Sequence, residues 1–190
     1  VTAGPNTSGW SLDTLDPGFS SSVSDTGASK HPNLTLTATR SDRQDNLRDM
    51  TFRLPDGFAG SVNNVVATCA DVDAAAGNCT STSQLGQVVV QTGSGAQTVT
   101  LNGTVHLNTA LSSELAKVSI QVPAVVGPFD LGDVVMYATM VINSGSTMSI
   151  NAVTVNMPQR IQGIPVRYRS VALTLNGIAT QGTGSTRRPG

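Results

Sequence analysis

Charged side chains are scarce in this 190-residue chain. They make up 12% of the residues, and the formal net charge is −1 at pH 7. The chain therefore has no basic field that could hold a phosphate backbone, and we expect no nucleic-acid partner. Ser, Thr, Asn, Gln and Gly take the place that Lys and Glu have on most intracellular surfaces, a composition common among extracellular β-proteins.

Long apolar runs are missing as well. None approaches the roughly 20 residues that a helix needs to cross a bilayer, so the sequence predicts no membrane insertion. Val1 opens a polar segment rather than a signal peptide, as expected of a mature exported protein or an excised fragment. The length suits one substantial domain with its own core.

Motifs that would carry chemistry are absent. The chain has no Gly-x-Ser-x-Gly elbow and no glycine-rich phosphate loop. Neither His31 nor His106 has a sequence neighbour that would make it a catalytic base or a metal ligand. Trp10, Tyr137 and Tyr168 lie too far apart to predict a carbohydrate-stacking platform. We therefore expect no enzyme activity, no cofactor and no metal, and a hydrolase site assembled from distant residues is the alternative.

Cysteine is limited to Cys69 and Cys79. They bracket a small acidic loop, in which residues 71–76 favour a single helical turn. With no histidine beside them and no second pair, the two cysteines predict one small disulfide rather than a metal site. Such a bond would stabilise the chain by roughly 2.5 to 3 kcal/mol and places it outside the cytoplasm.

Two acidic groups are candidate calcium ligands, namely Asp42, Asp45 and Asp49 in one and Asp71 and Asp73 in the other. Neither group has the spacing of a calcium loop. Arg40, Arg43 and Arg48 are interleaved with the first group, which favours surface ion pairing. An isopeptide staple is also disfavoured, because Lys117 is expected on the outward face of its strand.

Residues 1–30 are rich in Gly, Ser and Asp and are interpreted as an N-terminal arm or a linker-like leading strand. They carry scattered apolar residues, too many for a solvated linker and too few for a core. We therefore predict an assembly arm that packs on a neighbouring subunit or module, formed by Trp10, Leu12, Leu15 and Phe19. Residues 181–190 are expected to form a flexible tail.

Between these ends, residues 31–180 alternate apolar and polar side chains with a period of two, which predicts half-buried strands. The expected strands cover 31–39, 48–54, 85–91, 99–107, 116–122, 131–142, 147–156 and 166–176. Their regular spacing predicts an all-β fold, an antiparallel β-sandwich of about eight strands that is Ig-like or jelly-roll-like. A brief helical turn is expected around Glu114.

The alternation also predicts which side chains face the core. The inward set is Met50, Phe52, Leu54, Val99, Leu101, Ala116, Val118 and Ile120. Lys117, Ser119 and Gln121 are expected on the outward face, and Pro123 is expected to end their strand.

Four stretches together resemble a known kind of module: His31 to Thr35, Leu47 to Phe58, Cys69 to Cys79 and Ser83 to Gly86. They are similar to the repeated all-β modules in large secreted and cell-surface proteins of high-GC Gram-positive bacteria. The resemblance covers roughly residues 28–180. It implies export, a tandem arrangement and an all-β fold, and it implies no catalytic residues.

The leading functional hypothesis is a non-catalytic extracellular structural or assembly module of a cell-surface protein or filament. Its expected partners are copies of itself or adjacent β-modules. An adhesin-type binding module that recognises a surface or a glycan is the first alternative, with its ligand unknown. A viral or phage capsid or fibre domain is the second.

Overall fold

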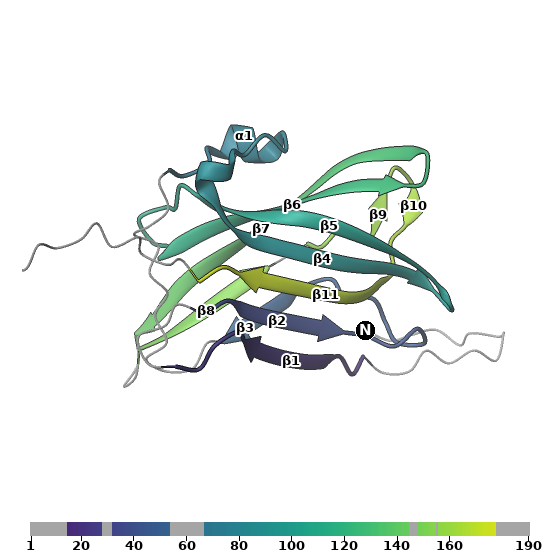
Figure 1. Cartoon of the computed structure of the whole chain (residues 1–190), viewed down its shortest axis with the longest axis horizontal. Coiled ribbons are helices and arrows are strands. Elements are labelled where there is room, and N and C mark those ends of the chain that lie inside the picture. Colours follow the sequence, from purple (N-terminus) through teal and green to yellow (C-terminus); the bar gives the residue numbers. More distant parts are fainter. Residues whose placement is uncertain (1–14, 28–31, 54–66, 145–147, 155, 178–190) are drawn as a thin grey trace, which may run out of the picture.

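The computed structural model describes residues 15–27, 32–53, 67–144, 148–154 and 156–177, and these residues are almost entirely β-structure (Figure 1). The strands are β1 (Gly18–Val23), β2 (Leu34–Thr39), β3 (Met50–Arg53), β4 (Gln84–Ser94), β5 (Gln97–Asn108), β6 (Ala116–Val126), β7 (Phe129–Ser144), β8 (Met148–Thr154), β9 (Arg160–Ile161), β10 (Ile164–Pro165) and β11 (Tyr168–Leu175). The helices among these residues are α1 (Asp71–Ala75) and the 3-10 turn η1 (Ser81–Ser83).

Nine of these strands form one sheet in the order β1-β2-β11-β4-β5-β6-β7-β8-β3, and β9 pairs with β10 in a separate small hairpin. Every pairing within the large sheet is antiparallel. The sheet curves until its ends face each other, with the rings of Phe19 on β1 and Phe52 on β3 centred 5.4 Å apart. The predicted antiparallel, sandwich-like fold with one small disulfide loop is confirmed.

The core lies inside this curve, and the strand registers show how alternation builds it. Met50 and Phe52 of β3 share cross-strand rows with Val118 and Ala116 of β6, so their predicted face is correct. Phe52 is nevertheless only half-buried, whereas Ala116, Val118 and Ile120 are buried. Leu54 lies outside the described residues. The other buried members of the cluster include Val88, Val90, Leu101, Val105, Leu107, Val122, Met136, Met157, Tyr168 and Val171.

Two local expectations are wrong. Pro123 does not end its strand, because β6 continues to Val126 through a register shift between Pro123 and Val125. The helical turn expected around Glu114 is an ordinary turn instead, in which the Glu114 side chain accepts a hydrogen bond from the Leu111 N–H over 3.0 Å. That turn lies within residues 109–115, which join β5 to β6.

Part of the N-terminal segment belongs to the sheet. β1 pairs along its whole length with β2 of the same chain, from Gly18 opposite Thr39 to Val23 opposite Leu34. Of the four residues assigned to the assembly arm, Leu15 and Phe19 are described and both are exposed. Trp10, Leu12 and residues 181–190 lie outside the described residues.

Candidate functional site

Cys69 and Cys79 are bonded to each other, as predicted, and the bond fastens a short layer onto the outer face of the sheet. The N–H of Cys69 donates to the carbonyl of Leu107 on β5 over 2.8 Å. The chain then turns through α1, which lies over β5 and β6 (Figure 1). We call residues 69–83 the cap. The expected single helical turn within it is confirmed.

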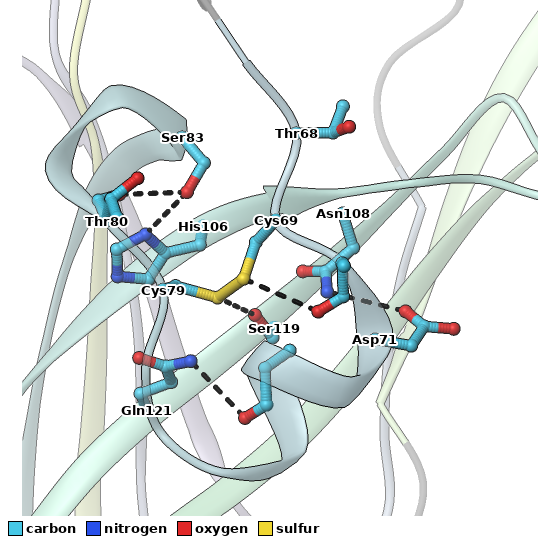
Figure 2. Close-up of a disulfide and its surroundings, with 12 residues drawn as sticks. Thr68, Cys69, Asp71, Cys79, Thr80, Ser83, His106, Asn108, Ser119 and Gln121 are labelled. Carbon is cyan, nitrogen blue, oxygen red and sulfur yellow. Dashed lines mark hydrogen bonds between the residues drawn. A yellow bond between two sulfur atoms is a disulfide. The ribbon is translucent and has the colours of Figure 1, made fainter.

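The cap buries polar side chains that the sequence placed on the outward face. Ser119 and Gln121 do point outward, yet both are buried, because the cap lies over them (Figure 2). The side-chain amide of Gln121 donates to the carbonyl of Ala74 over 3.3 Å, and Ser119 Oγ lies 3.8 Å from Cys79 Sγ. Alternation alone could not distinguish an outward face that meets water from one that meets a second layer.

An ion pair closes one side of the cap. Lys117 Nζ donates to Asp71 over 2.7 Å and lies 4.9 Å from the centre of the Tyr137 ring. The hydrogen bond from Lys117 is the main reason that the pKa of Asp71 is lowered, and a longer contact from Asn108 adds to it. Lys117 and Asp71 therefore pair with each other at the surface of the cap.

Ser83 and His106 form the one serine–histidine pair that could suggest a nucleophile among the described residues. Ser83 Oγ lies 3.1 Å from His106 Nδ1, and His106 Nε2 lies 2.9 Å from Thr104 Oγ1. Burial is the main cause of the lowered pKa of His106, which favours the neutral ring. Ser83 is itself buried and its hydroxyl donates to the carbonyl of Thr80 over 2.9 Å. The pair therefore locks η1 to β5 and has no open side for a substrate.

The loop between β2 and β3 is organised by Arg40, which sequence analysis assigned to surface ion pairing. Arg40 is buried instead. Its Nε donates to the carbonyl of Tyr168 over 2.7 Å, and its Nη1 donates to the carbonyls of Ser41 and Gln44. Burial, followed by the nearby charges of Arg167 and Arg169, lowers the pKa of Arg40. The interpretation as a surface pair was wrong for this residue, because its partners are main-chain carbonyls.

The acids of this loop also have separate partners. Asp42 forms an ion pair with Arg169 of β11 and accepts a hydrogen bond from the N–H of Gly95 over 2.6 Å. Asp49 accepts a hydrogen bond from the N–H of Asn156 over 2.7 Å. Within the described part of the chain, no three His, Cys, Asp or Glu side chains converge as a metal site would require.

β1 gives the sheet an open edge. It pairs with β2 on one side, and its sequence Gly-Phe-Ser-Ser-Ser-Val contains neither a charged residue nor proline. All six of its residues are exposed, including Phe19 at 58% and Val23. Among the described residues, the outer side of β1 has no main-chain partner.

A second opening lies inside the sheet, between β5 and β6. Their pairing covers Thr104 to Asn108 and stops at Thr104 opposite Gln121. Beyond that point the β4–β5 hairpin and the β6–β7 hairpin continue apart (Figure 1). We call the space between residues 97–103 of β5 and 122–126 of β6 the wedge.

A cavity lies on each face of the wedge. The outer one, of about 430 Å³, has a mixed lining, in which the polar side chains are Gln87, Asn102, Thr104, Gln121 and Asp133. The inner one, of about 550 Å³, is mainly apolar and includes Val99, Leu101, Val126, Leu131, Ile161 and Val166. The hairpin of β9 and β10 borders the inner cavity, tied to β7 by a hydrogen bond from Gln162 to the carbonyl of Leu131.

Searches against protein families, curated proteins and solved structures found no match to this chain. The resemblance to repeated bacterial surface modules therefore stays a prediction. None of the helices in the described residues has the length and apolar composition needed to span a membrane.

Proposed function

We propose that this chain is a non-catalytic extracellular structural module that joins copies of itself, or adjacent β-modules, through the open edge of β1. The observation that carries the proposal is the character of that edge. Proteins usually protect an edge strand with charges, proline, a bulge or a covering loop, since an unprotected edge pairs with other chains. β1 has no charge, no proline and no bulge, and it exposes Phe19 and Val23 beside its free main-chain groups.

The extracellular part of the proposal is supported by the disulfide and by the surface. A bond between Cys69 and Cys79 persists in oxidising compartments. The low share of charged residues and the resemblance to exported tandem modules point the same way. A non-catalytic role is supported by the burial of Ser83 and by the absence of a carboxylate partner for His106 among its described contacts.

The outer cavity supports a second candidate, a module that binds a surface glycan. Side chains from four neighbouring strands converge there, with Gln87, Thr104 and Gln121 in one cross-strand row and Asp133 in the next. Amide and carboxylate groups of this kind can hydrogen-bond to sugar hydroxyls, and small-molecule sites commonly have a few such convergent polar groups.

The mass of the purified protein across a range of concentrations tests the leading proposal. We expect the average mass in light scattering to rise with concentration, and the double variant Ser20→Lys/Ser22→Lys, which charges the β1 edge, to return the chain to a monomer. Thr80→Lys/Thr82→Lys is the matched control, because it adds the same charge at two exposed hydroxyl residues away from any sheet edge.

A wild-type chain that is monomeric at every concentration would overturn the assembly proposal and leave the binding module as the better reading. Equal loss of assembly in both lysine variants would also count against it, because general charge repulsion rather than edge pairing would then explain the change.

A further inference from the structure

Among the described residues, the wedge leaves main-chain edges unpaired inside the sheet. Residues 97–103 of β5 pair with β4 on one side, and beyond Gly103, which still lies against Gln121, their other side has no described partner. Residues 122–126 of β6 pair with β7 alone, and Pro123 and the register shift after it make β5 the more open of the two edges. Unpaired strand edges of this kind are where an extended segment can add to a sheet.

The two faces of the wedge differ in polarity, as the two faces of a strand do when apolar and polar side chains alternate. Successive side chains of a strand point to opposite faces. A segment lying in the wedge would direct one set of side chains into the mainly apolar inner cavity and the alternate set into the outer cavity, whose mixed lining offers hydrogen-bonding groups. The wedge therefore fits an extended polypeptide in which large apolar residues alternate with polar ones.

We propose that the wedge binds residues 10–13 from the arm of a neighbouring copy of this chain, with Trp10 and Leu12 in the inner cavity. The proposal rests on the assembly of copies proposed above and adds to the β1 edge a second contact, in which the wedge receives the arm. The sequence fits, because Trp10 and Leu12 alternate with Ser11 and Asp13. Trp10 is the single tryptophan of the chain, and a cavity of about 550 Å³ has room for large apolar side chains.

Charge is complementary as well. Of the residues that line the inner cavity, only Arg167 carries a charge, while the arm carries Asp13 and Asp16. Arg167 Nη2 has a long contact of 3.4 Å to the carbonyl of Asp42, so the guanidinium has further donors to offer.

The place where the described chain begins supports an exchange between neighbours. The carbonyl of Asp16 accepts a hydrogen bond from Gln44, in the same loop whose Asp42 contacts Gly95 at the tip of the β4–β5 hairpin. The described chain therefore begins at the end of the domain where the wedge opens. Two copies that meet at this end can each offer an arm to the other.

A neighbouring copy is the source we infer, because the arm then serves the assembly proposed above. The crosslink within one double-variant chain, described below, distinguishes this source from the chain's own arm.

A crosslinking experiment with the full chain tests the inference. One preparation carries Ser11→Cys and the other Asn102→Cys, which lines the outer cavity where Ser11 is expected. The two are mixed and treated with a short bismaleimide, which leaves the Cys69–Cys79 disulfide intact. A docked arm holds the thiols together, so we expect at least about tenfold more heterodimer than with Thr82→Cys, an exposed control position on the cap.

Trp10 emission provides the second measurement. We expect the emission of the wild-type chain to move to shorter wavelength as it assembles, and Val126→Glu to abolish that shift. Val125→Glu is the matched control, because Val125 is exposed and does not line the inner cavity. Each variant is first checked for the wild-type circular dichroism spectrum.

The outcomes separate this inference from the assembly proposal. If the chain assembles but the heterodimer does not exceed the Thr82→Cys level, the wedge is not the receiving surface, and assembly through β1 still stands. If the chain stays monomeric and Ser11→Cys crosslinks to Asn102→Cys within one double-variant chain, the arm fills its own wedge. That second result overturns both the neighbouring source and the assembly proposal.

Discussion

Phe19 and Phe52 bring the two ends of the sheet together. Their rings are 5.4 Å apart and tilted by 36°, although they belong to β1 and β3, which are the first and last strands in the sheet order. Among the residues that the structure describes, each of these strands is hydrogen-bonded on one side only. The aromatic contact therefore joins the ends of the curved sheet where no described main-chain pairing does.

Truncation of these rings should show that the contact is moderate in strength. Phe52→Ala should lower the free energy of unfolding by about 1 to 2 kcal/mol, below the roughly 3 to 5 kcal/mol of a fully buried phenylalanine, because Phe52 is half-buried. A double-mutant cycle with Phe19→Ala should give a coupling of about 0.5 to 1.5 kcal/mol in urea denaturation. A coupling of zero would mean that the rings do not meet in solution.

Loss of the Arg40 side chain should lower the free energy of unfolding far more than loss of a nearby exposed arginine. Arg40→Ala should cost about 3 kcal/mol of unfolding free energy, because several main-chain carbonyls would lose a buried charged donor. Arg48→Ala is the control, since Arg48 is exposed and lies 3.9 Å from Asp49, and its loss should cost less than about 1 kcal/mol. Equal effects in thermal or chemical denaturation would contradict the organising role of Arg40.

Reduction of the disulfide should loosen the cap and leave the sheet folded. The bond joins residues ten positions apart, and its loss should cost about 2.5 to 3 kcal/mol in the chain-entropy model. Hydrogen exchange should speed up at residues 69–83 and change little in β4 and β11, whose pairing does not involve the cap. Loss of the β-sheet circular dichroism signal on reduction would show that the cap is required for the whole fold.

Protonation of His106 should lower the stability of the fold in mild acid. Its pKa in the folded chain is below the ordinary value of 6.5, mainly because the ring is buried. The unfolded chain therefore takes up a proton first, and the contribution of the neutral ring is complete above about pH 6.5 and is lost as the pH falls toward the depressed folded value. His106→Gln should flatten the dependence of unfolding free energy on pH in this window. His31 is present in both proteins, so a persistent slope in the variant would place the cause elsewhere.

Alternation in the sequence predicted most of the sheet correctly, and for a physical reason. β2, β4, β5, β6, β7, β8 and β11 were all expected near their observed positions, because each buries one face against a common core and so keeps a period of two. Residues such as Val118 and Ile120 follow that rule directly. The disulfide was predictable too, since Cys69 and Cys79 had no other possible partner in the chain.

The missed features depend on contacts between segments that are distant in sequence. Nothing local indicates that Ser119 lies under the cap or that Arg40 finds the carbonyl of Tyr168, 128 residues away. The wedge was equally hidden, because Val99 and Val126 alternate with polar or exposed neighbours as ordinary strand residues do. Nothing in either segment marks the point at which the pairing of β5 with β6 ends. When each segment is considered alone, a buried arginine looks like a surface residue, and the strands beside the wedge look continuously paired.

The position of β11 has a consequence for how the chain folds during synthesis. In the finished sheet β11 lies between β2 and β4, yet it is the last of the described strands along the chain. Until it is made, the β1–β2 hairpin has no neighbour on its inner side and β4 has an open edge. Pairings between such distant segments form slowly. A growing chain therefore stays incompletely folded until residues 168–175 emerge, so the polypeptide completes its sheet only as a whole.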